Sequence, residues 1–189
     1  MANFYIALLH YPVYNKNGQV VTTSVTSLDV HDIARAARTY GVKRFYIVTP
    51  VIAQQQLVGK ILRHWQQGYG ANYNSSRREA FDIADVKSTL DEVISDIAKE
   101  VHSLRLVATG ASLTGRLLTF GGLRTQFRES DDSYLLMFGT GWGMAQELLA
   151  RADFLLESIK GVADYNHLSV RSAVSVVLDR LCGREADKL

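Results

Sequence analysis

The sequence contains only one cysteine, Cys182, and two prolines among its 189 residues. A single cysteine excludes an internal disulfide framework. No apolar run approaches the roughly 18–20 residues that a membrane helix needs. The first residues turn polar after a short apolar stretch and lack the basic leader of a signal peptide. These absences predict a protein of the cytoplasm that does not enter a membrane.

The motifs of several enzyme classes are absent as well. The five histidines show no metal-ligand spacing with Cys182 or with carboxylates, so no metal site is expected. Neither the G-x-S-x-G elbow of serine hydrolases nor the phosphate-binding pattern G-x-x-x-x-G-K-[ST] occurs.

A large excess of one charge sign is also missing, because the formal net charge is +2. Bulk charge of this size does not indicate a nucleic-acid binder. An RNA-binding surface would need local clustering, and scattered solvated arginines explain the sequence equally well. The candidates for such a cluster are Arg77, Arg78, Arg116, Arg124 and Arg128.

What the sequence does contain is an alternation of short apolar runs and amphipathic segments. The apolar runs predict strands at 4–9, 44–49, 81–86, 104–108, 134–138 and 154–157. The amphipathic segments predict helices at 29–40, 52–67, 88–101, 122–128, 145–151 and 169–181. This order is typical of an α/β fold with a mostly parallel sheet and helices on both faces. We expect one domain over residues 1–189.

Three local predictions concern caps and loops. Ser27 or Thr26 is expected to cap the helix at 29–40, and Ser88-x-x-Asp91 resembles a capping box for the helix that follows. In the helix at 52–67, the residues expected to face inward are Leu57, Ile61, Leu62 and Trp65. The glycine-rich, polar segment 68–80 predicts a long mobile loop.

In parallel α/β sheets, ligands bind where the strands end at their carboxyl side. Gly139, Gly141 and Gly143 follow one predicted strand and precede a helix. They fit a tight turn, or a dinucleotide fingerprint in which Glu157 holds a ribose. Met144 stands where the last glycine of that fingerprint belongs, and only one strand follows, so a nucleoside pocket fits better than the usual dinucleotide fold.

Two further segments carry candidate functional residues. Asn166–Ala173 leads into the last helix with Ser169 as its N-cap, either as an ordinary cap or as a wall of a pocket. Asp29, Asp32 and Arg35 lie within reach of one another along the first helix. They form either a solvated, salt-bridged face or an arginine prepared for an RNA phosphate or base.

Together these segments resemble the SPOUT class of RNA methyltransferases. Asp29–Ala37 resembles the class's first motif, N-x-G-A-I-x-R-T-A, and places Arg35 at the catalytic arginine; Leu135–Gly139 with the following glycines resembles the second motif, and Asn166–Ala173 the third. Nearly the whole chain, in particular HYPVYNKNG, LDVHDIARAARTYGV, LLMFGTGWG and YNHLSVRSA, is similar to a small stand-alone subfamily described as S-adenosylmethionine-dependent RNA methyltransferases. Asp29 replaces the usual asparagine, His31 a glycine, and Gly141 a frequent glutamate.

The resemblance implies a trefoil knot near the C-terminus, S-adenosylmethionine as cofactor, and tRNA or rRNA as substrate. It also implies a homodimer in which Arg35 of one subunit reaches the cofactor of the other. We assign the catalytic role to Arg35, Asp29 and His31, with His10 as a further candidate base. The expected cofactor-binding residues are Thr109, Gly110, Phe138, Gly139, Gly141, Ile159, Gly161, Leu168 and Ser169. The alternatives are a knotted binding module without transferase activity and a nucleotide-binding oxidoreductase.

Overall fold

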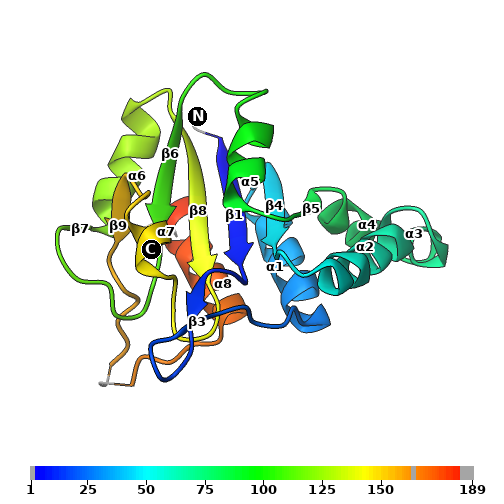
Figure 1. The fold of residues 1–189 in the computed structure, drawn as a ribbon. Coiled ribbons are helices and arrows are strands. Elements are labelled where there is room, and N and C mark those ends of the chain that lie inside the picture. Colours follow the sequence, from blue (N-terminus) through cyan, green and yellow to red (C-terminus); the bar gives the residue numbers. More distant parts are fainter. Residues whose placement is uncertain (1–2, 163–164, 184–189) are drawn as a thin grey trace.

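The structure is a computed structural model, which describes residues 3–162 and 165–183. Its centre is a seven-stranded sheet in which every pair of neighbouring strands is parallel (Figure 1). In spatial order the strands are β5 (Ala84–Lys87), β4 (Arg44–Val48), β1 (Phe4–Leu9), β8 (Ser133–Gly139), β6 (Leu104–Ala108), β9 (Phe154–Leu156) and β7 (Leu117–Leu118). The predicted α/β class with a mostly parallel sheet is confirmed.

Two apolar layers enclose the sheet because successive side chains of a strand point to opposite faces. On β1, Ile6 and Leu8 belong to one buried cluster, while Tyr5, Ala7 and Leu9 belong to the other. The first cluster is covered by α1 (Ser27–Thr39), α2 (Ile52–Gln66), α4 (Ser75–Phe81), α6 (Phe120–Glu129) and α8 (Val170–Cys182). The second is covered by α5 (Leu90–Ile97) and α7 (Gln146–Leu149).

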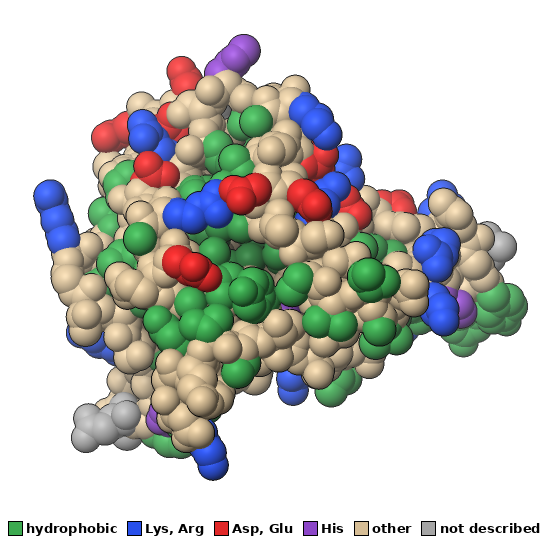
Figure 2. Space-filling model, viewed as in Figure 1, with side chains coloured by type: hydrophobic (Ala, Val, Ile, Leu, Met, Phe, Trp, Pro, Cys, Tyr) green, Lys and Arg blue, Asp and Glu red, His purple; other side chains and the backbone are tan. Residues whose placement is uncertain are grey.

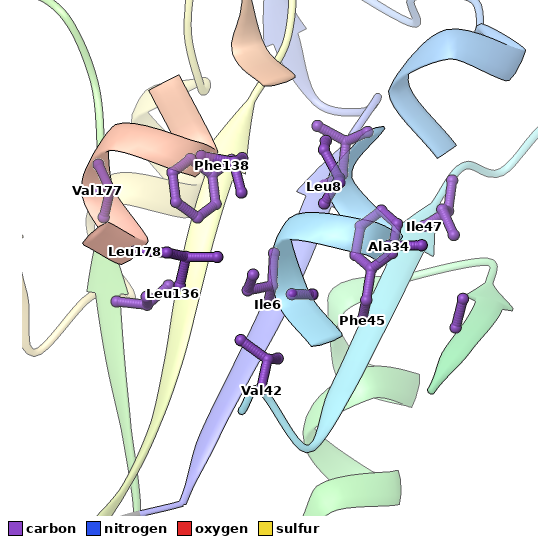
Figure 3. Packing of buried hydrophobic residues seen from close by; sticks show 14 of the residues in the cluster. Ile6, Leu8, Ala34, Val42, Phe45, Ile47, Leu136, Phe138, Val177 and Leu178 are labelled. Atoms are coloured by element: carbon purple, nitrogen blue, oxygen red, sulfur yellow. The ribbon is translucent and has the colours of Figure 1, made fainter. Parts of the chain in front are cut away.

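Figure 3 shows the first layer from close by, with Leu178 of α8 beside Leu136 of β8 and Ala34 of α1 beside Phe45 of β4. All four side chains are fully buried. Burial of a leucine or phenylalanine side chain stabilises a fold by about 1.5–3 kcal/mol. This layer therefore fixes α1 and α8, which carry two of the predicted motifs, against the middle of the sheet.

Polar contacts fix α8 next to α1. Near the start of both helices, Arg171 pairs with Asp29 (Nη1–Oδ1, 3.3 Å) and with Asp32 (Nε–Oδ2, 3.4 Å). Near their ends, the Tyr40 hydroxyl donates to Asp179 Oδ1 at 3.0 Å. The two helices thus run side by side in the same direction, and two distant parts of the sequence form one surface.

Several local predictions were wrong. Segment 68–80 is not an irregular loop but contains α3 (Tyr69–Tyr73) and most of α4. Asn74 caps α4, where its side chain accepts from the Arg77 amide at 3.0 Å. Leu57 is exposed rather than inward, and Val58 takes the buried position. The helix after β5 is capped by Thr89, one residue beyond the predicted Ser88.

The sequence also gave no expectation for the small strands. A hairpin of β2 (Val13–Tyr14) and β3 (Val20–Val21) follows β1, and its turn uses Gly18 at a positive φ of 74°. Thr26 is the observed cap of α1, as one of the two predicted candidates. No helix in the described part of the chain is long and apolar enough to cross a membrane.

Candidate functional site

The carboxyl ends of the central strands meet at one edge of the sheet, because all strand pairs are parallel (Figure 1, bottom). Three segments follow these ends and are called the strand-end loops: residues 109–116 after β6, 139–144 after β8 and 157–168 after β9. Seven of the nine predicted cofactor-binding residues lie in these loops. Phe138 lies just before the second loop, and Ser169 just after the third.

The loop after β8 is held tightly by the hairpin. The Trp142 amide donates to the Tyr14 carbonyl at 2.9 Å, and the Tyr14 amide donates to Gly143 at the same distance. Gly141 has a φ of +60°, and a Cβ there would lie 2.8 Å from the Tyr14 carbonyl oxygen. Glycine is therefore required at 141 for the close packing of the loop against the hairpin, and the observed role of this residue is structural.

The loops after β6 and β9 are joined to each other. Thr109 fixes the start of the first loop, since its amide and its hydroxyl both donate to the Met137 carbonyl, at 3.1 and 2.9 Å. Asn166 Nδ2 donates to the Ala111 carbonyl at 3.1 Å and thereby links the two loops.

Much of the backbone in these two loops is open to a ligand. Among the described residues of 110–116 and 158–168, the structure contains no backbone–backbone hydrogen bond. Such peptide groups need water or a ligand as a partner.

Apolar side chains flank these free peptide groups. Ile159 packs on the core, Phe138 is buried beneath the edge, and Leu168 is 48% exposed. Apolar walls combined with free backbone groups are what the adenosine part of S-adenosylmethionine needs. The residues present therefore fit this cofactor.

Glu157 and Ser169 have structural tasks at helix starts. Glu157 Oε1 accepts from the Phe120 amide at 2.8 Å and caps α6 together with Thr119. The observed role of this carboxylate is therefore at the start of α6, and the structure gives no support to its role as the ribose ligand of a dinucleotide fingerprint. Ser169 is the N-cap of α8 and accepts from the Ser172 amide, as predicted.

Asp29 lies in the first turn of α1 and is 7% exposed. Its carboxylate accepts from the Thr26 hydroxyl at 2.6 Å and pairs with Arg171 of α8. The Asp29 amide donates back to Thr26 at 3.1 Å. The residue therefore joins the start of α1 to the start of α8, beside the third strand-end loop.

His31 points to another side of α1, as expected for a residue two positions further along a helix. Its ring contacts Trp65 and Phe81 edge to face, with centroid distances of 5.6 and 4.8 Å. Burial, and then the positive charge of Arg77, lowers the pKa of His31. The structure thus places His31 in an aromatic cluster with α2 and α4, apart from Asp29.

Arg35 is exposed one turn after His31 and lines a hollow between α1 and α4. We call this hollow the basic groove; its lining residues are Arg35, Arg38, Thr39, Asn74, Ser76, Arg77, Glu79 and Ala80. None of the predicted cofactor-binding residues belongs to it. Within a single subunit, the arginine and the strand-end loops are therefore separate features.

His10 is fully buried where β1 ends. Its Nδ1 lies 3.0 Å from the Thr23 hydroxyl, which contacts the hydroxyl of Thr140 after β8. Nε2 has no hydrogen-bond partner among the described residues. Burial lowers the pKa of His10 to about 4, with the Asp29 carboxylate opposing the shift. A neutral imidazole whose Nε2 has no described partner thus lies where β1 ends, next to the start of the loop after β8; the sequence offered His10 as a candidate base, but its burial is visible only in the structure.

The fold is an α/β fold whose parallel sheet brings three loops together at the carboxyl ends of its strands. A family model described as SAM-dependent RNA methyltransferase matches residues 3–183. The chain belongs to this family, which confirms the resemblance stated for the sequence, the RNA methyltransferase activity and S-adenosylmethionine as cofactor.

Similar proteins agree with this assignment. An uncharacterized protein of Aquifex aeolicus is 42% identical over 183 residues, covering 96% of this chain and 89% of that protein. A tRNA (guanine-N(1)-)-methyltransferase of Oleidesulfovibrio alaskensis is 40% identical over 185 residues, covering 96% of this chain but 42% of the longer protein. Among solved structures, a putative methylase family protein of Neisseria gonorrhoeae shares the fold with a TM-score of 0.66 at 20% identity, covering 97% and 83% of the two chains.

Proposed function

We propose that this RNA methyltransferase acts on tRNA, with its cofactor in the strand-end loops and Arg35 as the residue that positions the acceptor. The observation that carries the proposal is the backbone of the described residues of 110–116 and 158–168, which makes no backbone–backbone hydrogen bond and lies beside apolar side chains. The tRNA substrate is supported by the 40% identity to the Oleidesulfovibrio enzyme. Because the chain spans 42% of that enzyme, its substrate is part of the proposal.

The predicted cofactor-binding residues would contribute in two ways, some through apolar side chains and others through backbone groups. Ile159 and Leu168 would form the apolar walls for adenine, with the buried Phe138 supporting the edge beneath them. The backbone of the loops that carry Gly110, Gly139 and Gly161 would supply hydrogen bonds. S-adenosylmethionine itself supplies an activated methyl group, so the chain mainly has to align the acceptor with that group.

Arg35 suits the positioning role because it is exposed and no carboxylate of the described chain lies within ion-pairing distance. A guanidinium can hold an RNA phosphate in a bidentate manner. In the dimer implied by the family resemblance, Arg35 would act at the cofactor loops of the partner subunit. This arrangement accounts for the separation of Arg35 from the loops of its own subunit.

An acceptor hydroxyl or ring nitrogen must also lose a proton. Asp29 is held by Thr26 and Arg171, and its negative charge makes it a candidate base at the start of α1. His10 is neutral and has a free nitrogen close behind the loops. His31 would act more indirectly, through the aromatic cluster that holds α4 beside Arg35.

Calorimetric titration with S-adenosylmethionine and S-adenosylhomocysteine tests the cofactor site. We expect both to bind at one site per subunit, and Leu168→Asp to weaken both. Incorporation of labelled methyl groups into tRNA and rRNA fractions then tests the substrate. Binding without incorporation into any RNA would favour the binding module without transferase activity.

Subunit mixing tests the shared site. Arg35→Ala and Leu168→Asp should each be inactive alone. The first variant lacks the arginine that positions the acceptor, and the second has a damaged cofactor site. After subunit exchange we expect about a quarter of the wild-type rate, since half of the dimers are mixed and each contains one complete site. No recovery despite demonstrated exchange would show that Arg35 serves its own subunit.

A further inference from the structure

Residues 65–81, called the projection, extend beyond the edge strand β5 and away from the strand-end loops (Figure 1). The tip of the projection carries two exposed aromatic rings. Tyr69 and Tyr73 of α3 are each 77% exposed, and their rings are stacked with a centroid distance of 6.0 Å and an angle of 20°. Figure 2 shows apolar side chains at this tip with basic side chains beside them.

Trp65 connects this tip to the rest of the molecule. A Cβ at Gly70 would lie 2.7 Å from the Trp65 ring, so α3 lies directly on the indole and needs glycine there. The guanidinium of Arg77 lies over the same ring, 4.5 Å from its centroid. His31 of α1 contacts it as well. The tyrosine pair, Arg77 and α1 are therefore held in a fixed relation by one side chain.

The basic groove lies between the projection and α1. Arg35 and Arg77 contribute two positive charges, and no described carboxylate lies within ion-pairing distance of either. Arg38 pairs with Glu79 at 3.3 Å, and both side chains are more than half exposed. Asn74 and Ser76 add polar groups. The groove thus has a net positive charge beside a pair of exposed rings.

We infer that the projection is a single-strand RNA-binding element, with a nucleobase stacked on Tyr69 and Tyr73 and a backbone phosphate in the basic groove. This combination of aromatic faces and a positive groove is what single-stranded nucleic acid requires. A tyrosine face accepts any base, so the element holds nucleotides flanking the acceptor rather than reading their sequence. The inference deepens the proposed function and rests on RNA being its substrate.

A paired helix does not offer its base faces for stacking, whereas an unpaired strand does. The two parts of the element therefore make different predictions. Loss of the tyrosine rings should weaken the binding of single strands and leave duplex binding unchanged. Loss of the Arg77 charge should weaken both, because both RNAs carry phosphates.

Fluorescence anisotropy with labelled single-stranded oligoadenylate, and with duplex RNA of the same length, tests the inference. Tyr69→Ala/Tyr73→Ala should weaken single-strand binding roughly tenfold or more. Tyr69→Phe/Tyr73→Phe keeps the rings and should bind within about twofold of wild type. Arg77→Ala should reduce the slope of log affinity against log salt by roughly 0.7 for the single strand.

Lys99→Ala is the charge control, since Lys99 is exposed beyond the end of α5 on the other face of the sheet. It should leave the affinity and the salt slope close to the wild-type values. Unchanged single-strand affinity in the double alanine variant would overturn the inference, as would equal effects of Arg77→Ala and Lys99→Ala. Calorimetry with S-adenosylmethionine on the same preparations separates failure of this inference from failure of the proposed function. Lack of cofactor binding by the wild type would count against the proposed function alone.

Discussion

The strand-end loops and the projection differ in which groups they present to a ligand: backbone groups in the loops, and side chains in the projection. The loops follow strands that end in the buried core, and peptide groups hold Thr109, Trp142 and Gly143 in place. In the projection, α3 packs on the Trp65 indole and α4 on the core, and its exposed features are side chains, above all Tyr69 and Tyr73. A cofactor of fixed shape suits the first kind of site, and a flexible strand of varied sequence suits the second. Substitutions should therefore affect cofactor and RNA separately.

Arg35→Ala tests this separation with the largest expected effect. The guanidinium is exposed in the basic groove, which contains none of the predicted cofactor-binding residues. We expect methyl transfer to fall by roughly 10²–10³-fold, as for other preorganised charged donors, while cofactor affinity changes less than about twofold. Single-turnover transfer and calorimetry measure the two quantities. Arg44→Ala is the matched control, because Arg44 is an exposed arginine at the amino end of β4, whereas the strand-end loops lie at the carboxyl ends of the strands. Loss of cofactor binding in Arg35→Ala would remove the assignment.

We expect the free energy of unfolding to depend on pH because of His10, which lies on the side of the strand-end loops and not in the projection. Its folded pKa of about 4 lies below the unfolded value near 6.5, so the unfolded state binds more protons in between. Stability should therefore fall as pH decreases through this window, by at most about 3 kcal/mol from this residue.

Urea unfolding of wild type and His10→Gln measures that contribution. The difference between the two proteins at pH 8 reports packing only, because His10 is then neutral in both states. At pH 4.5 the difference should shift in favour of His10→Gln. An equal difference at both pH values would contradict the buried neutral imidazole.

On the side of the strand-end loops, two glycines separate the effect of close packing from that of backbone strain. Gly141→Ala places a Cβ 2.8 Å from the Tyr14 carbonyl oxygen at a φ of +60°, and should destabilise the fold by about 2 kcal/mol. Gly18→Ala is the control: its φ is +74°, but nothing lies within 4 Å of the added Cβ. It should cost about 1 kcal/mol from backbone strain alone. Equal losses in thermal or urea unfolding would mean that the loop moves away from the hairpin.

Gly70→Ala should have the smallest effect on global stability and a clear effect on RNA. The added Cβ would meet the Trp65 ring at 2.7 Å, so α3 must shift together with its two tyrosines. Because α3 contributes little to the buried clusters, we expect less than about 1 kcal/mol in unfolding free energy. Single-strand RNA affinity should fall while cofactor binding persists. Unchanged RNA affinity would show that RNA binding does not depend on the position of α3.

The accuracy of the sequence predictions follows the same division. The central strands and the long helices were predicted well, because buried apolar runs and helical periodicity are local signals. Segment 68–80 was predicted wrongly, since its glycines and polar residues are typical of loops. Its helices depend on contacts outside the segment, with Trp65 for Gly70 and with the core for Ala80 and Phe81. The predicted cofactor-binding residues were named by motif position, whereas Gly141 packs against a hairpin whose strands no pattern indicated.

By itself, the sequence determined the α/β class, the family and the order of its motifs, because these depend on residue spacing along the chain. Only the tertiary structure decided which side chains share a site. It joined Asp29 to Arg171, placed His31 among aromatic rings, and left His10 buried with a free nitrogen. It also placed Arg35 in a basic groove with Arg77. Such contacts join residues far apart in the chain, and their geometry follows from the packing of helices on the sheet rather than from any local pattern.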